Sequence, residues 1–148
     1  MTARRKDRVV VDTGVIMAVI AYRSKRLVPV FEKARSEDDL VISNIILMQC
    51  ARQADKSKCS MSREEIIAKV RELCPNVVEI AIIPLEELRA RYSMRDDSDL
   101  EILYTADVLD ADIIVTSDND FFDERNPPRG IRAKILRPFE YLGRRRGQ

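Results

Sequence analysis

The sequence predicts a three-layer α/β/α fold, in which helices cover both faces of a parallel sheet of four to five strands. Short runs of Val, Ile and Leu recur along the chain, and a longer stretch with apolar residues at helical spacing follows each of them. These short runs do not alternate with polar residues, which is typical of strands buried on both faces. Strands that alternate with helices in this way form parallel sheets.

The expected strands are the short apolar runs, at residues 8–12, 40–43, 77–83, 112–116 and 133–136. The stretches between them predict helices over residues 14–22, 27–36, 44–55 and 62–74, one that begins at Pro84, and two more over 98–110 and 138–142. Two of these helices begin with a capping-box pattern, Ser62-Arg-Glu-Glu65 and Ser98-Asp-Leu-Glu101, in which the serine is the expected N-cap residue.

The 148 residues are expected to form a single domain with flexible basic ends at residues 1–7 and 143–148. No apolar run approaches the roughly 18 residues of a membrane span, and the first residues lack the features of a signal peptide. We therefore expect a cytoplasmic protein without membrane contact. The sequence contains no His, which excludes catalysis by Ser–His or Cys–His pairs and, with only three widely spaced cysteines, argues against zinc.

Charge is strongly segregated along the chain, although the net charge is only +1. Residues 1–35 hold 9 Lys and Arg against 3 Asp and Glu, and residues 125–148 hold 8 against 1. Residues 96–124 hold 11 acids and no Lys or Arg. The basic ends favour a polyanionic partner such as a nucleic acid, whereas the acidic block would repel one unless a cation neutralised it.

Three acids fall where the predicted topology brings distant segments together. Asp12 ends the first expected strand, Asp118 follows the fourth, and Asp99 lies in the first turn of the helix before that strand. Sites in open α/β sheets form at the carboxyl ends of strands, near the point where the strand order reverses. We therefore expect the three carboxylates to meet in one crevice.

Carboxylates held within a few ångströms of one another destabilise a fold unless a cation lies among them. Oxygen ligands of this kind suit Mg²⁺ or Mn²⁺, and either ion can activate water for attack on a phosphoryl group. Basic segments beside such a centre would bind the flanking phosphates. This combination predicts a metal-dependent phosphodiesterase.

The order and spacing of several short motifs resemble the PIN-domain family, and the resemblance covers residues 8 to 142. The motifs are Val-Val-Val-Asp12-Thr-Gly-Val-Ile, Val41-Ile-Ser43, Arg95-Asp-Asp-Ser-Asp99, Ala111-Asp-Ile-Ile-Val-Thr116-Ser-Asp118-Asn-Asp120-Phe-Phe and Ile135-Leu-Arg-Pro138-Phe-Glu-Tyr-Leu. The last of these looks like the end of the VapC-like branch, the toxins of bacterial and archaeal toxin–antitoxin pairs.

The resemblance implies a PIN-like sheet and an endoribonuclease that depends on Mg²⁺ or Mn²⁺. It assigns catalysis and metal binding to Asp12, Asp99 and Asp118, with Asp120 as a further candidate ligand. It also implies an RNA substrate, an antitoxin protein as partner, and assembly into a homodimer or a higher homo-oligomer. An antitoxin could inhibit such an enzyme by inserting an Arg or Lys into the acidic groove.

Two positions depart from the family pattern. The family's second acid lies six residues after the serine that ends the second strand, and here that position is Gln49. One negative charge is therefore missing from the expected site, which Asp96, Asp97 or Glu101 could replace. Gly14 stands where the family usually has Asn or Ser, which is expected to alter hydrogen bonding around Asp12 without removing a ligand.

Alternative interpretations of the same residues stay open. Asp12 could only cap a helix, Asp99 could only favour a helix dipole, and Asp118 could only stabilise a turn. Glu101 is expected to be the reciprocal arm of the second capping box rather than a ligand. Ser43 and Thr116 are expected to orient the site through hydrogen bonds, with Gln49 as a weak ligand or hydrogen-bond partner.

Other functions also stay open. A catalytically weak or inactive PIN-like module would bind RNA or protein without cutting, because of Gln49. An aspartic protease would share Asp12-Thr-Gly14 but is β-rich, and this chain alternates strands with helices. A haloacid-dehalogenase-type phosphatase would need an Asp at position 14, where this chain has glycine.

Overall fold

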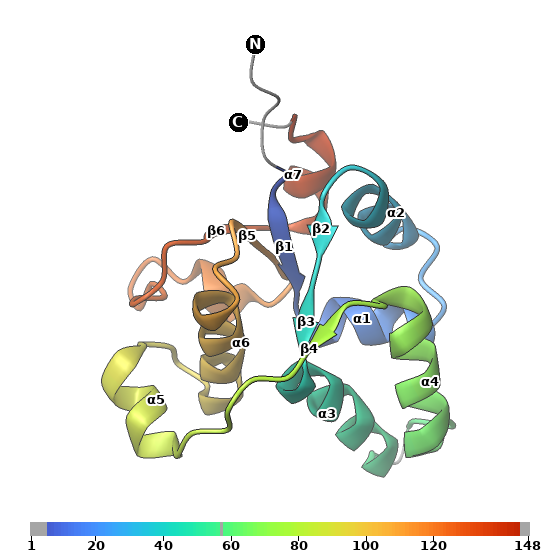
Figure 1. The fold of residues 1–148 in the computed structure, drawn as a ribbon, viewed down its shortest axis with the longest axis horizontal. Helices are drawn as coiled ribbons and strands as arrows, with labels where there is room; N and C mark the ends of the chain where they lie inside the picture. The colour runs from blue at the N-terminus through green and yellow to red at the C-terminus, as the bar shows by residue number, and fades with distance from the viewer. Residues whose placement is uncertain (1–5, 57, 146–148) are drawn as a thin grey trace.

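Four parallel strands form the central sheet of the computed structural model, which describes residues 6–56 and 58–145 (Figure 1). Their order is β2-β1-β5-β6, and their bounds are β1 Arg8–Val11, β2 Asp39–Leu40, β5 Ile113–Val115 and β6 Lys134–Leu136. A second, two-stranded parallel sheet pairs β3 (Ile42–Ser43) with β4 (Val77–Val78). The predicted α/β class with a parallel sheet of four to five strands is therefore confirmed.

Helices α1 to α6 lie between the strands in the sequence, as expected for a parallel sheet, and α7 follows the last strand. Their bounds are α1 Thr13–Ile20, α2 Val28–Ser36, α3 Asn44–Arg52, α4 Arg63–Leu73, α5 Leu85–Arg91, α6 Asp97–Val108 and α7 Pro138–Gly143, with 3₁₀ turns η1 at Gln53–Asp55 and η2 at Asn119–Phe122. The chain moves in one direction along the sheet from β1 to β2 and in the other from β2 to β5. Right-handed crossovers then put α1 and α2 on one side of the strands and α6 on the other (Figure 1).

Strands β1 and β5 form the centre of the sheet and explain its aliphatic core. Val9, Val10 and Val11 pair with Ile113, Ile114 and Val115, and the side chains of all six are fully buried. A fully buried Val or Ile side chain stabilises the fold by about 1.5–3 kcal/mol relative to an exposed one. This register also puts the residues that follow the two strands, at positions 12 and 116, side by side.

The expected strand at residues 40–43 is in fact two strands in two sheets. Val41 is the residue between β2 and β3, and its N–H donates to the carbonyl of Val9 in β1. The expected strand at 77–83 is likewise wrong in length, because β4 ends at Val78. Strand β4 is short because its partner β3 ends at Ser43, where α3 begins. Beyond this point the side-chain amide of Asn44, instead of a strand, hydrogen-bonds both the N–H and the carbonyl of Ile80.

Of the two predicted capping boxes, the one at the N-terminus of α6 is wrong. Ser62 caps α4 as predicted, with reciprocal bonds between Ser62 and Glu65. In α6 the N-cap residue is Asp96, whose Oδ1 accepts from both the N–H and the hydroxyl of Ser98, at 3.0 and 2.9 Å. Helix α6 therefore begins one residue before Ser98, and Glu101 is not the arm of a capping box.

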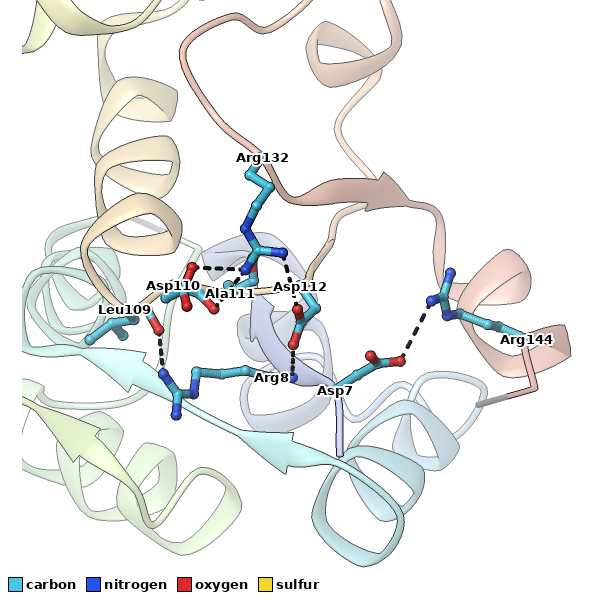
Figure 2. A network of polar contacts seen from close by, with 8 residues as sticks. All are labelled: Asp7, Arg8, Leu109, Asp110, Ala111, Asp112, Arg132 and Arg144. Carbon is cyan, nitrogen blue, oxygen red and sulfur yellow. Dashed lines mark hydrogen bonds and ion pairs between the residues drawn. The ribbon is translucent and has the colours of Figure 1, made fainter. Parts of the chain in front are cut away.

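A network of arginines and aspartates joins the amino ends of the strands (Figure 2). Asp12 and Asp118 follow the opposite, carboxyl ends of β1 and β5. The N–H of Arg8 donates to Oδ2 of Asp112 at 2.7 Å, and its guanidinium donates to the carbonyl of Leu109 at 2.7 Å. Arg132 bonds Asp110 and Asp112, while Arg144 lies 3.6 Å from Asp7. The network thus ties β1 to β5, to β6 and to the end of α6.

The ends of the chain are described only in part. Residues 1–5 and 146–148, which belong to the expected flexible ends, lie outside the described residues. Within the described ranges, no helix is both long enough and apolar enough to span a membrane.

Candidate active site

A cleft of about 620 Å³ opens beyond the carboxyl ends of β1 and β5. This is the point at which the strand order reverses, where α/β folds place their ligands. Four acids line the cleft, Asp12, Asp99, Glu101 and Asp118. The other lining residues are mostly polar or basic: Thr13, Gly14, Met17, Tyr22, Gln49, Arg52, Gln53, Lys56, Ser98 and Ser117. The structure therefore brings Asp12, Asp99 and Asp118 to one cleft.

A second cavity of about 660 Å³ lies between α2 and α7. Its polar groups already bond one another, because the hydroxyl of Tyr141 donates to Asp38 at 2.6 Å and Lys33 donates to the carbonyl of Tyr141 at 2.7 Å. The acidic cleft is therefore the better candidate for an active site, despite its slightly smaller volume.

Asp12 is held at the N-terminus of α1 with only 7% of its surface exposed. Its N–H donates to the carbonyl of Val115, and its Oδ2 accepts a hydrogen bond of 2.8 Å from the hydroxyl of Thr116. Burial raises the pKa of Asp12 to about 6, although the bond from Thr116 lowers it and the neighbouring Asp118 raises it further. Asp12 is thus a buried acid in a fixed orientation.

Asp118 is positioned by the same threonine. The N–H of Asp118 donates to the hydroxyl oxygen of Thr116 at 3.0 Å, so this hydroxyl donates to one acid and accepts from the next. The Oδ1 of Asp118 accepts from the N–H of Asp120 at 2.9 Å and caps the η2 turn. Thr116 therefore orients both strand-end acids.

Asp99 is the least satisfied polar residue of the cleft. It lies in the first turn of α6 with 6% of its surface exposed, and its Oδ2 is buried without a hydrogen-bond partner in the described part of the chain. Burial and the negative charges of Asp118, Asp12, Asp96 and Asp120 raise the pKa of Asp99 to about 8. A buried carboxylate of this kind is costly unless a cation neutralises it.

Asp120 and Asp96 approach Asp99 from the outer side of the cleft. Carboxylate oxygens of Asp96, Asp99 and Asp120 lie within 4.8 Å of one another, a spacing that allows them to share one cation. The guanidinium of Arg95 lies 3.9 Å from Oδ1 of Asp120 at the exposed edge of this group. Asp99 thus belongs both to the cleft acids and to this second group.

These carboxylates are compatible with a hard divalent cation. Mg²⁺ and Mn²⁺ prefer oxygen donors, and the described residues supply carboxylates without histidine or cysteine in the cleft. The buried, unbonded Oδ2 of Asp99 offers a ligand atom that no protein group uses. Among the described residues, Asp96, Asp99 and Asp120 have oxygens close enough to share one ion, and Asp12 and Asp118 line the same cleft as Asp99.

Gln49 bridges three helices at the edge of the cleft. Its Oε1 accepts a hydrogen bond of 2.6 Å from the hydroxyl of Thr13 in α1. Its Nε2 donates to the carbonyl of Ser98 at 3.1 Å and to Oε1 of Glu101 at 3.2 Å, both in α6. Gln49 therefore uses both ends of its amide for contacts within the protein.

Ser43 lies outside the cleft, although the sequence suggested that it orients the site. Its buried hydroxyl pairs with that of Thr105 at 2.8 Å and accepts weakly from the N–H of Ile46, so it joins α3 to α6. Sequence reasoning also missed three cleft residues, Tyr22, Arg52 and Lys56. Tyr22 and Arg52 lie within the predicted helices 14–22 and 44–55, and Lys56 directly follows the second, which does not indicate where their side chains point.

Comparison with known proteins identifies the family and the fold of the chain. The family model of the PIN domain matches residues 9–125 of the chain. The fold is similar to the structure described as VapBC2 from Rickettsia felis bound to a DNA fragment from their promoter, with a TM-score of 0.62, 18% identity, and coverage of 88% of this chain and 98% of that chain. It is also similar to the structure of FitAB bound to an IR36 DNA fragment, with a TM-score of 0.54, 15% identity, and coverage of 88% and 95%. A search of curated proteins finds no match.

Proposed function

Because the chain belongs to the PIN-domain family, we propose that it is an endoribonuclease that depends on Mg²⁺ or Mn²⁺. The ligands of the ions are Asp12, Asp99 and Asp118, with Asp120 and Asp96 at the outer side. The single observation that carries the proposal is the buried Oδ2 of Asp99, which has no hydrogen-bond partner among the described residues. A carboxylate buried in this way is neutralised either by a proton or by a cation, and a cation is favoured because three further carboxylates line the same cleft.

A divalent ion in this cleft would stabilise negative charge on a phosphoryl group and lower the pKa of water. The protein's own residues position the reacting groups. Thr116 holds Asp12 and Asp118 in a fixed relative orientation, and the tight packing of β1 against β5 keeps them there. Preorganisation of this kind lowers the cost of reaching the reactive geometry.

The basic residues of the cleft support a nucleic-acid substrate. Arg52 and Lys56 line the cleft beside the acids, where they can bind phosphates on one side of the scissile bond. Tyr22 also lines the cleft and is 59% exposed, which makes its ring available for stacking on an unpaired base. These residues favour a single-stranded segment of RNA as substrate.

The proposal extends to partners. Two of the similar solved structures are the VapBC2 and FitAB assemblies. By analogy with them we propose that this chain also pairs with an antitoxin protein, and that it assembles into a homodimer. The acidic cleft suits a basic side chain of the antitoxin, which would compete with the metal ions for Asp99.

A second candidate function rests on Gln49. This residue contributes no charge and is saturated with contacts to Thr13, Ser98 and Glu101. If these contacts leave the metal site too weak for turnover, the chain is a PIN-like module that binds RNA or protein without cutting it.

The test is a cleavage assay on structured and single-stranded RNA with Mn²⁺, Mg²⁺ or EDTA. We expect the parent to cut RNA with either metal ion and not with EDTA, and Asp118→Asn and Asp99→Asn to abolish cutting. Glu124→Gln is the matched control, because Glu124 is an exposed acid of the loop between η2 and β6 and lies outside the cleft. RNA binding without cutting by the parent would select the binding module.

A further inference from the structure

Glu101 is the fourth acid of the cleft and has no role in the assignments above. It lies two residues after Asp99 in α6, and its side chain lines the same cleft as Asp12, Asp99 and Asp118. Sequence reasoning assigned it to a capping box, but Asp96 caps this helix instead. Its carboxylate is therefore not bound to the helix N-terminus.

The two carboxylate oxygens of Glu101 differ in their hydrogen bonds. Its Oε1 accepts from Nε2 of Gln49 at 3.2 Å, and its Oε2 accepts no hydrogen bond in the described part of the chain. A carboxylate with one oxygen held by an amide keeps its other oxygen available to a ligand.

Gln49 is well suited to hold this carboxylate. The hydroxyl of Thr13 donates to Oε1 of Gln49, and the carbonyl of Ser98 accepts from Nε2, so both contacts fix the direction of the amide. An acid at position 49 could not serve in this way, because a carboxylate has no N–H to donate to Ser98 or Glu101.

We propose that Glu101 replaces the acid that is missing at position 49, as a fourth metal-binding carboxylate, and that Gln49 is the residue that positions it. The inference rests on the proposed metal site and deepens it. A second, independent observation points to a cation between these acids, since the buried Oδ2 of Asp99 in the same cleft has no hydrogen-bond partner among the described residues. With Glu101 the cleft has four carboxylates without any charge at position 49.

The first experiment measures Mn²⁺ affinity by calorimetry on the full chain, without RNA. Glu101→Gln removes the charge but keeps an acceptor for Gln49, so the fold is retained. We expect its dissociation constant for Mn²⁺ to rise roughly tenfold or more. We expect its melting temperature in EDTA to equal that of the parent or to exceed it. Glu124→Gln, a neutralisation outside the cleft, is expected to leave both values unchanged.

A second variant tests the positioning role. Gln49→Met keeps the volume of the side chain but removes all of its hydrogen bonds, so Glu101 is no longer held. We expect the Mn²⁺ dissociation constant to rise several-fold in Gln49→Met and to show no further change when Gln49→Met is added to Glu101→Gln. Additive losses in the double variant would overturn the positioning role.

The outcomes separate this inference from the proposed function. If the parent binds Mn²⁺ and Glu101→Gln binds it equally well, the inference is wrong, while cleavage by the parent would still support the nuclease. If Glu101→Gln loses affinity for Mn²⁺ but the parent cuts no RNA, the assignment of Glu101 as a metal ligand is supported and the nuclease proposal is wrong. A parent that binds no Mn²⁺ at millimolar concentration overturns the inference, whatever the cleavage assay gives.

Discussion

The hydroxyl of Thr116 donates a hydrogen bond of 2.8 Å to Oδ2 of Asp12, across 104 residues of sequence. The contact follows from the register of β1 and β5, in which Val11 lies opposite Val115. The next residue of each strand then leaves the sheet at the same edge. The same hydroxyl accepts from the N–H of Asp118, so one side chain sets the relative position of two acids from different parts of the chain.

Replacing Thr116 with Val removes this hydroxyl without changing the size of the side chain. Oδ2 of Asp12 loses the bond that lowers its pKa, and the N–H of Asp118 loses its acceptor. We expect the free energy of unfolding to fall by about 1–2 kcal/mol. We expect RNA cleavage with Mn²⁺ to fall roughly tenfold, because the two acids are no longer held together.

Thr105→Val is the control for this prediction. Thr105 is a fully buried threonine whose hydroxyl bonds Ser43 at 2.8 Å, outside the cleft. The change is expected to cost a similar amount of stability without a similar loss of cleavage. Equal losses of cleavage in the two variants would mean that Thr116 acts only through stability.

The metal-free protein is expected to lose stability as the pH rises from 6.5 to 9. The pKa of Asp99 is raised to about 8 in the folded state, above its ordinary value of 3.8. A carboxyl group whose pKa is raised by folding favours the folded state while it is protonated. This contribution is complete below the unfolded pKa and is lost as the pH rises through about 8. Asp12 has already lost most of its own contribution, around pH 6.

Thermal unfolding in EDTA measures this effect. We expect the melting temperature to fall by roughly 5–10 °C between pH 6.5 and 9. Saturating Mn²⁺ is expected to remove most of the fall, because the ion favours the ionised carboxylate. Asp99→Asn is expected to remove it without metal. A melting temperature that stays constant in EDTA over this range would show that Asp99 is ionised at little cost.

The positions of the three main acids could be predicted because strand ends are visible in the sequence. Asp12 and Asp118 each follow a run of Val and Ile, and parallel strands bring their carboxyl ends to one edge. The first turn of α6 could also be predicted, because polar residues precede an apolar helical pattern there. These features are local, and the parallel topology then determines which of them meet.

The predictions that were wrong, the capping box at Ser98 and the length of the strand at 77–83, depend on competition between similar local signals. Asp96 and Ser98 are both good N-cap residues, and sequence alone gives no reason to prefer one. The choice decides whether Glu101 bonds its own helix or Gln49 of α3. Similarly, the end of β4 depends on where α3 begins, because a strand needs a partner with free N–H and carbonyl groups. Such decisions depend on contacts between segments that are distant in the sequence.

Gln49→Glu restores the acid that the family pattern has at this position. Sequence alone predicts a more active enzyme. The structure adds a cost, because the new carboxylate would face the carbonyl of Ser98 and the carboxylate of Glu101, which now accept bonds from Nε2 of Gln49. We expect the melting temperature of this variant in EDTA to fall by about 2–5 °C at pH 8, and Mn²⁺ to raise it by more than it raises that of the parent.

Gln53→Glu is the matched comparison for Gln49→Glu. It adds the same charge to another residue that lines the cleft and that, unlike Gln49, forms no hydrogen bond with Glu101. We expect Gln53→Glu to lower the melting temperature in EDTA by less than Gln49→Glu does, and Mn²⁺ to raise it by less. If the two variants behave alike, the cleft responds to its total charge and the contact between positions 49 and 101 has no particular role.

Gly130 anchors the loop before β6 to the end of α5. Its φ angle is +91°, and a Cβ atom at this position would lie 2.3 Å from the carbonyl oxygen of Arg91. The residues beside this contact, Ser93 and Arg129, exchange two backbone hydrogen bonds of 3.3 Å. The segment after Ser93 leads directly to Asp96 and the N-terminus of α6. The loop therefore supports the segment that positions Asp99.

Gly130→Ala is expected to lower the free energy of unfolding by about 2–4 kcal/mol, because the methyl group strains the backbone and collides with a carbonyl that cannot move independently. Gly14→Ala is the comparison, since a Cβ at Gly14 meets no atom within 4 Å and the residue lies in α1. For Gly14→Ala we expect the free energy of unfolding to rise by about 0.5–1 kcal/mol. Urea unfolding of both variants measures the difference. A Gly130→Ala variant as stable as the parent would mean that the loop can leave α5 at little cost, and Asp99 would then owe its position to the packing of α6 alone.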